Sequence, residues 1–278
     1  MTFLVIGATG RTGRGVVAGL RSRGETVRAA ARGAEARFDW ADPGTWDDVL
    51  RGADAAYVVT PERPDFPGAA VADFVAWARA AGVRRLVLLS GRSARTGSAR
   101  LLEREAPVRE SGLEWTILRP SQFAQNFGAG PYLAAVRAGE LRLPLGPEPG
   151  PRVDFVDVAD IADVAVRALT SDGHAGRVYD LSGPRAIAFG EALAEIAAAT
   201  GRTLRYADVP YDDWLAGRRA AGASDEAVAW STETFTGLRR GDYATVYPDV
   251  RAVLGREPRD FAGYVREAAA SGVWEVSN

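Results

Sequence analysis

Residues 7–13 of this chain read G-A-T-G-R-T-G, and their setting indicates the fold. This stretch follows the short apolar run Phe3–Ile6 and leads into residues 13–23, where apolar side chains recur at helical spacing. In such a strand–loop–helix unit the first glycine permits a tight turn and the second lets the backbone approach a pyrophosphate. The third lets helix and strand pack closely, and the N–H groups that open the helix face the phosphates. We therefore predict a dinucleotide-binding site at this loop.

Strand-like and helix-like segments alternate through the first half of the chain. Strands are expected at 3–6, 26–31, 36–40, 55–59, 85–89 and 115–118, and helices at 13–23, 46–50, 69–81 and 98–111. Strands separated by helices predict a parallel sheet with right-handed crossovers, and continuous apolar strands fit a sheet covered on both faces. The predicted fold is α/β, a doubly wound parallel (Rossmann) sheet.

The second half of the chain is mostly helical in its patterning. Residues 144–151 are too rich in proline and glycine for a regular element and are expected to form a loop. A strand is expected at 178–181, and helices at 161–169, 189–199, 212–221, 224–235 and 259–270. We predict an NAD(P)-binding Rossmann core at 1–150. Residues 151–278 are expected to complete that core and to form a small, mostly helical C-terminal substrate lobe.

The composition excludes several classes of function. The 278 residues carry a net charge of −2, so no basic excess indicates nucleic acid or anionic lipid. All 34 basic residues are arginine, so neither a Tyr-x-x-x-Lys dyad nor a P-loop lysine can exist. The absence of cysteine and the single histidine exclude thiolate zinc and multi-histidine metal sites. Residues 1–6 are too short for a signal peptide and no apolar run reaches membrane-spanning length, so we expect a cytoplasmic monomer or homodimer.

The position that distinguishes NAD(H) from NADP(H) lies about 20 residues past such a loop. Here it is occupied by Arg32, at the end of the predicted strand 26–31. An acidic residue would bind a ribose 2′-OH, whereas a guanidinium suits a 2′-phosphate, and Arg11 in the loop could add a second contact. The alternative is that Arg32 is a solvated surface residue. We predict NADP(H) as the cofactor.

Other chemistry-bearing residues have two interpretations each. Ser90 ends a parallel strand, where it either hydrogen-bonds substrate and relays a proton or caps the following loop. Trp214 and Trp230, on predicted helices, either wall an aromatic substrate pocket or pack in the core. The acidic series Asp154, Asp157, Asp160 and Asp163 is expected to supply a helix cap rather than to bind a metal. Arg92, Arg95 and His174 are expected at the surface.

Residues 115–127 read W-T-I-L-R-P-S-Q-F-A-Q-N-F. This segment resembles the (Y/W)-T-(I/V)-L-R-P-x-x-F-x-x-N-F signature of the NmrA-like atypical short-chain dehydrogenases. The same family is matched by G-A-T-G-R-T-G at 7–13, F-D-W at 38–40, V-R-R-L-V-L-L-S at 83–90, D-V-A-D-I-A at 157–162 and G-R-E-P-R-D-F at 255–261. The resemblance spans almost the whole chain and is greatest to bacterial relatives of festuclavine dehydrogenases and of NAD(P)H-dependent quinone or azo reductases.

The resemblance implies a role for each matched position. The phosphates of the cofactor would be held by Gly7, Thr9, Gly10, Arg11, Thr12, Gly13 and Arg32. The adenine would lie by Asp39 and Trp40, and the ribose and nicotinamide by Thr60, Pro61, Ser90 and Gly91. The nicotinamide face would be framed by Pro120, Ser121 and Phe123, and the substrate would be faced by Gln122, Asn126 and Phe127. Some relatives keep a lysine where this chain has Leu102, so no lysine-dependent step is expected.

The expected function is that of an NADPH-dependent reductase acting on a small organic molecule that accepts hydride readily. Iminium ions, quinones, azo compounds and activated alkenes qualify, and secondary metabolism is the expected setting. The proton would come from water or from a hydroxyl such as that of Ser90. Two alternatives remain open: a non-catalytic NADP(H) sensor that binds protein partners, and a redox-neutral enzyme such as a cyclase or an epimerase.

Overall fold

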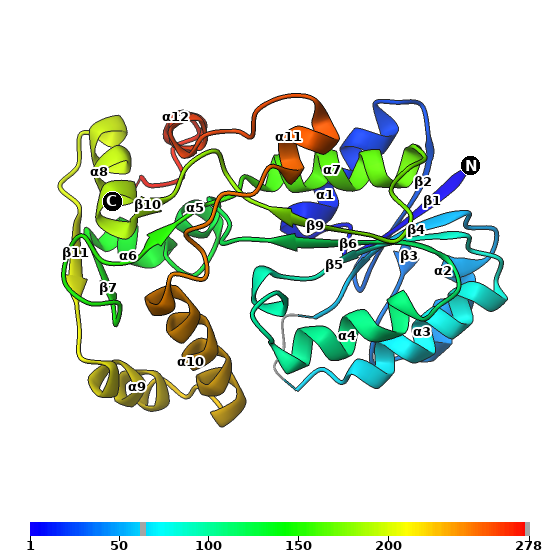
Figure 1. Ribbon diagram of the computed structural model, residues 1–278, viewed down its shortest axis with the longest axis horizontal. Coiled ribbons are helices and arrows are strands. Elements are labelled where there is room, and N and C mark those ends of the chain that lie inside the picture. The colour runs from blue at the N-terminus through cyan, green and yellow to red at the C-terminus, as the bar shows by residue number, and fades with distance from the viewer. Residues whose placement is uncertain (62–64, 276–278) are drawn as a thin grey trace. The chain divides into compact units, whose positions relative to one another are not determined.

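A seven-stranded parallel sheet organises the first of two compact units in the computed structural model, which describes residues 1–61 and 65–275. This unit comprises Met1–Pro120, Val158–Leu181 and Asp249–Arg256. Its strands are β1 (Thr2–Ile6), β2 (Thr26–Ala31), β3 (Ala36–Arg37), β4 (Ala55–Val59), β5 (Arg85–Leu89), β6 (Glu114–Pro120) and β9 (Arg177–Leu181). Their order is β3-β2-β1-β4-β5-β6-β9 (Figure 1). The predicted Rossmann sheet is thereby confirmed.

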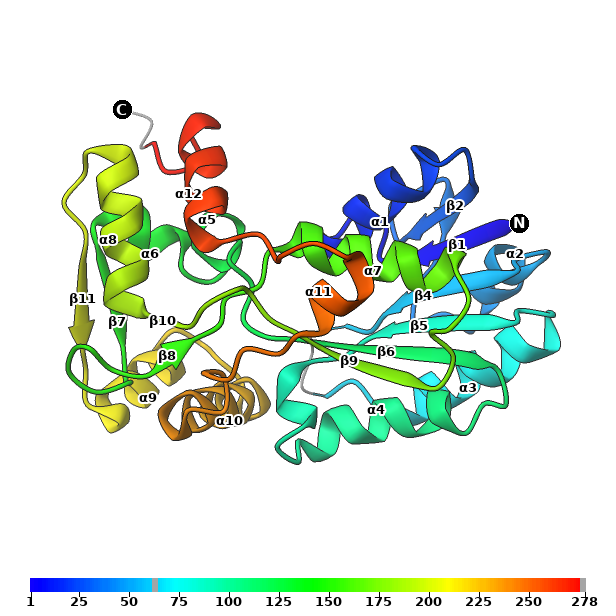
Figure 2. The ribbon, with the colours of Figure 1, turned by 45° about the horizontal axis from the view of Figure 1, so that its top comes forward.

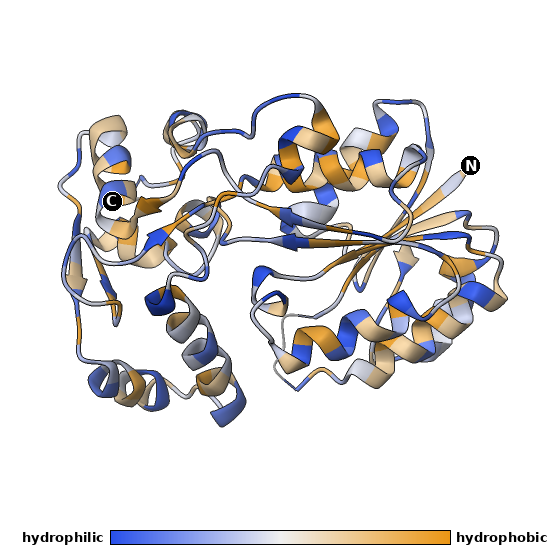
Figure 3. Cartoon of the chain, in the orientation of Figure 1, coloured by the Kyte–Doolittle hydropathy of each residue, from blue (hydrophilic) through white to orange (hydrophobic). Residues whose placement is uncertain are grey.

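Helices cover both faces of this sheet, as Figure 2 shows. One face carries α1 (Arg11–Arg21), α7 (Val158–Thr170) and α11 (Asp249–Leu254), and the other carries α2 (Trp46–Leu50), α3 (Gly68–Ala80) and α4 (Ala99–Arg109). Short 3₁₀ turns lie at η1 (Pro43–Thr45) and η2 (Arg92–Ala94). Gly15 lets helices α1 and α7 lie close together, since a Cβ at this position would be only 2.8 Å from Cβ of Ala162. The buried strands form the apolar centre of the sheet (Figure 3).

The expected strand at 36–40 is shorter in the structure. It ends at Arg37 because Asp39 turns the chain, its Oδ1 accepting a hydrogen bond from the backbone N–H of Ala41 at 3.0 Å. Phe38 packs instead on Trp46, the two rings stacked with centroids 6.1 Å apart. Phe38 of the F-D-W segment therefore belongs to the aromatic core that packs against the sheet.

The second unit comprises residues 121–157 and 182–248 and the chain from Glu257 onward. Its helices are α5 (Asn126–Ala129), α6 (Leu133–Ala138), α8 (Phe189–Thr200), α9 (Tyr211–Ala220), α10 (Asp225–Arg240) and α12 (Phe261–Ala270). Two small sheets pair β8 (Arg152–Val153) with β10 (Ile187–Ala188) and β7 (Glu140–Leu143) with β11 (Arg205–Asp208). Helices make up most of the unit's regular secondary structure. Both units draw segments from beyond residue 150, and the functional division at that residue stays a prediction.

None of the helices in the described part of the chain is long and apolar enough to cross a membrane.

Candidate cofactor and substrate sites

The glycine loop between β1 and α1 has a backbone that only glycine can build. Gly7 adopts a φ of 74°, in the left-handed region that favours glycine, and its carbonyl accepts a hydrogen bond from the N–H of Gly10 at 2.8 Å. A Cβ on Gly13 would lie 2.1 Å from that same carbonyl oxygen. Thr9 and Gly10 are exposed where α1 begins, so the loop leaves the helix N-terminus open to a ligand. This cradle fits a pyrophosphate.

Thr12 is held in place by a buried tyrosine of the neighbouring strand. The hydroxyl of Tyr57, on β4, donates a hydrogen bond to Oγ1 of Thr12 at 3.0 Å. Burial raises the pKa of Tyr57 well above its ordinary value, so the phenol keeps its proton and remains a donor. The Thr12 position was identified from the glycine motif. Tyr57 was not, because nothing in the strand sequence distinguishes it from a core residue.

Arg32 directly follows β2 and is exposed. Within the described residues it forms no hydrogen bond or ion pair. Arg11, the first residue of α1, is half-buried. An exposed guanidinium without a protein partner is able to meet an anionic ligand group.

Trp40 is hydrogen-bonded to the end of strand β4, and Asp39 precedes it in the chain. The indole N–H of Trp40 donates to the carbonyl of Val59 at 3.0 Å, and its ring packs edge-on against Phe38 and Phe66. Both Asp39 and Trp40 are half-buried. Their place beside the adenine stays a prediction.

Arg104 of helix α4 binds Thr60 and Pro61, which follow β4, and also Phe66. Its guanidinium donates to Oγ1 of Thr60 at 3.3 Å, to the carbonyl of Pro61 at 3.2 Å and to the carbonyl of Phe66 at 3.2 Å. Burial lowers the pKa of Arg104 to about 10, which still leaves it charged at neutral pH. This role was not predictable from the sequence, because Arg104 is one of several arginines on a helix.

Ser90 stands at the end of β5 and is bonded to a buried carboxylate. Its hydroxyl donates to Oε1 of Glu105 at 2.7 Å, and Glu105 is fully buried on α4. Arg119 donates to both oxygens of that carboxylate, at 2.8 and 2.5 Å, and Arg109 donates to Oε2 at 3.1 Å. Burial by itself raises the pKa of Glu105, but the hydrogen bonds from Arg119 and Ser90 outweigh it and hold the pKa below its ordinary value. Gly91, half-buried, follows as the cap of η2.

The signature segment continues past Pro120, the last residue of β6, into the second unit. There Ser121 donates a hydrogen bond to the buried Asp154. The side-chain amide of Asn126 donates to Oε1 of Gln122 at 3.2 Å, and Phe123 forms a bridge with Val156. Gln122 and Phe123 are half-buried, whereas Ser121 and Asn126 are buried.

Phe127 lies in the core of the second unit. It is fully buried, with ring centroids 5.2 Å from Tyr132, 5.3 Å from Phe155 and 5.4 Å from Phe261. Its aromatic neighbours place it among residues that stabilise the unit.

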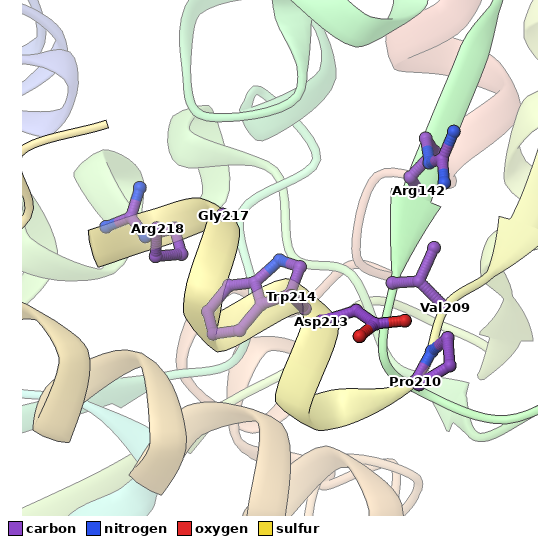
Figure 4. Close-up of a pocket in the computed structure, with 7 residues that line it drawn as sticks. All are labelled: Arg142, Val209, Pro210, Asp213, Trp214, Gly217 and Arg218. Carbon is purple, nitrogen blue, oxygen red and sulfur yellow. The ribbon is translucent and has the colours of Figure 1, made fainter. Parts of the chain in front are cut away.

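Trp214 lines a pocket of about 280 Å³ in the second unit (Figure 4). The residues around it come from β7, α9 and the segment before α9: Arg142, Val209, Pro210, Asp213, Trp214, Gly217 and Arg218. The indole packs edge-on against Phe235 at 4.7 Å, and the guanidinium of Arg218 lies 5.8 Å from its centre. Trp230, half-buried on α10, is not one of these lining residues.

Several charged residues fill roles that their sequence context did not reveal. Asp160 and Asp163 pair with Arg256 at 2.8 and 2.6 Å. The expectation that Arg92 is a solvated loop charge is wrong: it is 1% exposed and donates to the carbonyl of Leu181 at 3.1 Å. The loop after β5 curls back onto the end of β9, and this buries the guanidinium.

Residues 7–172 match the family model of NAD(P)H-binding proteins. The chain belongs to this NAD(P)H-binding family. It is 37% identical to the (4-alkanoyl-5-oxo-2,5-dihydrofuran-3-yl)methyl phosphate reductase of Streptomyces griseus subsp. griseus, over 96% of this chain and 98% of that protein. It is 34% identical to the NAD(P)H azoreductase of Xenophilus azovorans, over 97% and 98%.

A solved structure has the same fold as this chain over nearly the whole length of both proteins. The NADPH-dependent quinone oxidoreductase from Escherichia coli, crystallised with NADPH, superposes with a TM-score of 0.78 at 21% identity. The alignment covers 95% of this chain and 99% of that one. The predicted family is confirmed, and the chain is an NAD(P)H-dependent oxidoreductase.

Proposed function

We propose that this protein uses NADPH to reduce a small organic acceptor by direct hydride transfer. The observation that carries the proposal is the glycine cradle that opens α1, together with Arg32, which is exposed and has no partner among the described residues. Arg32 stands at the position where NAD(H)-binding chains have an acid. A guanidinium there attracts a 2′-phosphate. Unlike a carboxylate, it cannot accept a hydrogen bond from a plain 2′-hydroxyl. NADP(H) therefore suits the site better than NAD(H).

The residues of this chain divide the work of holding the cofactor. Gly7, Gly10 and Gly13 leave room for the pyrophosphate, and Thr9, Arg11 and Thr12 add side-chain contacts around it. Arg32 takes the 2′-phosphate, Asp39 and Trp40 lie by the adenine, and Thr60, Pro61, Ser90 and Gly91 line the ribose and nicotinamide. Pro120, Ser121 and Phe123 frame the reactive face. NADPH, when bound, supplies a hydride from C4 of its nicotinamide.

The acceptor is proposed to be one that takes hydride without strong acid catalysis. No lysine exists in the chain, so no tyrosine can be activated by a Tyr-x-x-x-Lys dyad. Iminium ions, quinones, azo compounds and activated alkenes meet this condition, and two relatives act on a furanone phosphate and on azo compounds by name. Gln122, Asn126, Trp214 and Trp230 are the proposed substrate residues, whereas Phe127, also expected to face the substrate, packs in the core of the second unit. A cytoplasmic location and a role in secondary metabolism remain predictions.

The test is anaerobic turnover with each of the four acceptor classes, followed by loss of absorbance at 340 nm and by isolation of the product. We expect one class to consume NADPH and yield a product two electrons more reduced. A protein that binds NADPH and NADP⁺ but consumes neither would support the sensor alternative. Product formation without net oxidation of NADPH would support a redox-neutral enzyme.

A further inference from the structure

The hydroxyl of Ser90 has a single proton, and the structure shows where that proton goes. Ser90 is the donor to Glu105 at 2.7 Å, because a carboxylate can only accept. The carboxylate is fixed in turn by Arg119, which grips both of its oxygens, and by Arg109. The lone pairs of the Ser90 oxygen therefore remain available to accept a hydrogen bond from a molecule bound beyond the end of β5.

We propose that Glu105, held by Arg119, is a positioning residue that makes Ser90 a hydrogen-bond acceptor in the active site rather than a proton donor. Ser90 then recognises an N–H or O–H group of a bound molecule, which is either the carboxamide of the nicotinamide or a donor on the acceptor substrate. The inference rests on the proposed function and names the part that Ser90 takes in it.

A proton donated outward by Ser90 would leave an alkoxide at hydrogen-bond distance from an ionised carboxylate. Glu105 is fully buried, with Arg119 and Arg109 as its charged partners, and has no proton to return. Two adjacent anions in a buried site are strongly disfavoured. The protein thus provides no proton at this position.

Hydride transfer to an iminium acceptor is balanced without a proton from the protein. Hydride brings two electrons and one hydrogen to carbon, the C=N π pair moves to nitrogen, and a neutral amine results. With a quinone the same transfer leaves a hydroquinone anion, which takes its proton from water. Acceptors of these two kinds are therefore favoured over azo compounds, since hydride transfer to an azo group leaves a more basic nitrogen anion.

Ser90→Ala and Ser90→Thr test the assignment, because threonine keeps the hydroxyl. Ser111→Ala is the matched control, since Ser111 hydrogen-bonds to Val108 at the other end of α4. The first readout is the Kd for NADPH by calorimetry, without any acceptor. The second is the KM for a hydroxyl-bearing quinone, and the third is the solvent deuterium isotope effect on single-turnover hydride transfer.

We expect Ser90→Ala to raise either the NADPH Kd or the quinone KM about 2- to 13-fold, the range of one neutral hydrogen bond, and Ser90→Thr to restore it. A change in Kd identifies the carboxamide as the donor, and a change in KM alone identifies the acceptor substrate. The solvent isotope effect is expected to be the same in wild type and Ser90→Ala.

Two results would overturn the assignment. In one, the wild type shows a solvent isotope effect that Ser90→Ala abolishes, and small buffer acids restore the rate of that variant. In the other, Ser90→Ala changes neither Kd nor KM. A wild-type protein that fails to bind NADPH would instead refute the proposed function, so the two failures are distinguishable.

Discussion

Gly13 offers the sharpest perturbation of the cofactor loop. In Gly13→Ala the new methyl carbon would lie 2.1 Å from the carbonyl oxygen of Gly7, 2.8 Å from its carbonyl carbon and 3.0 Å from Cα of Ala8. All three atoms are backbone, so no side-chain rotation relieves the clash. Restoring an ordinary carbon–oxygen contact of about 3.3 Å requires the loop and α1 to separate by about 1.2 Å.

The expected cost follows from that displacement. Overpacking a tight site lowers the free energy of unfolding by about 1–3 kcal/mol. A loop displaced by about 1 Å also misplaces the N–H groups at the start of α1, and we expect the Kd for NADPH to rise at least about tenfold, or about 1.4 kcal/mol. The assays are urea unfolding followed by circular dichroism and calorimetric titration with NADPH.

Gly263→Ala is the matched control. A Cβ at this helical position meets only Nη2 of Arg266, at 3.8 Å, so the substitution fits and is expected to be neutral or stabilising by up to about 1 kcal/mol. If Gly13→Ala bound NADPH as tightly as Gly263→Ala does, the close approach of helix and loop would not govern the cofactor site.

Three further predictions concern charged residues. Arg32→Ala should weaken NADPH binding by about 1.5–3 kcal/mol and leave NADH binding nearly unchanged; equal losses for both cofactors in calorimetry would contradict the 2′-phosphate role. Arg104→Met keeps contact with Phe66 but removes the hydrogen bonds to the loop at Thr60, so the free energy of unfolding should fall by about 1–3 kcal/mol and the NADPH Kd should rise; a wild-type Kd and melting temperature would refute it. Glu105→Gln should cost about 3–5 kcal/mol near pH 7 because it leaves Arg119 buried without its anion. The pKa of Glu105 is lower folded than unfolded, so its stabilisation is complete above about pH 4.3 and is lost as the pH falls through the folded pKa. The difference in melting temperature between wild type and Glu105→Gln should shrink on acidification, and a constant difference would contradict the assignment.

Most strands of the large sheet were predictable because they are short apolar runs, several of them separated by helical segments. The glycine loop was equally clear, because it follows an apolar strand and opens a helix. The sequence did not predict β7, β8, β10 and β11, which have two to four residues each and too few positions for a periodic pattern. Their pairing depends on neighbours that are distant in the chain.

The supporting residues of the site were the hardest to find. Tyr57, Arg104 and Glu105 act through side chains of other residues, and each sits in an ordinary strand or helix pattern. Glu105 follows Arg104 directly on α4, yet Arg104 binds Thr60 after β4 and Glu105 binds Ser90 at the end of β5. Such roles become visible only when long-range contacts are known, because local sequence carries no signal for them.

Calorimetric titration of the purified protein with NADPH, NADP⁺, NADH and NAD⁺ tests the central claim most directly. The account predicts that NADPH binds most tightly and that both 2′-phosphorylated forms bind at least about tenfold more tightly than their counterparts, a difference of about 1.4 kcal/mol. Equal affinity for NADPH and NADH, or no binding of any of the four, would contradict it.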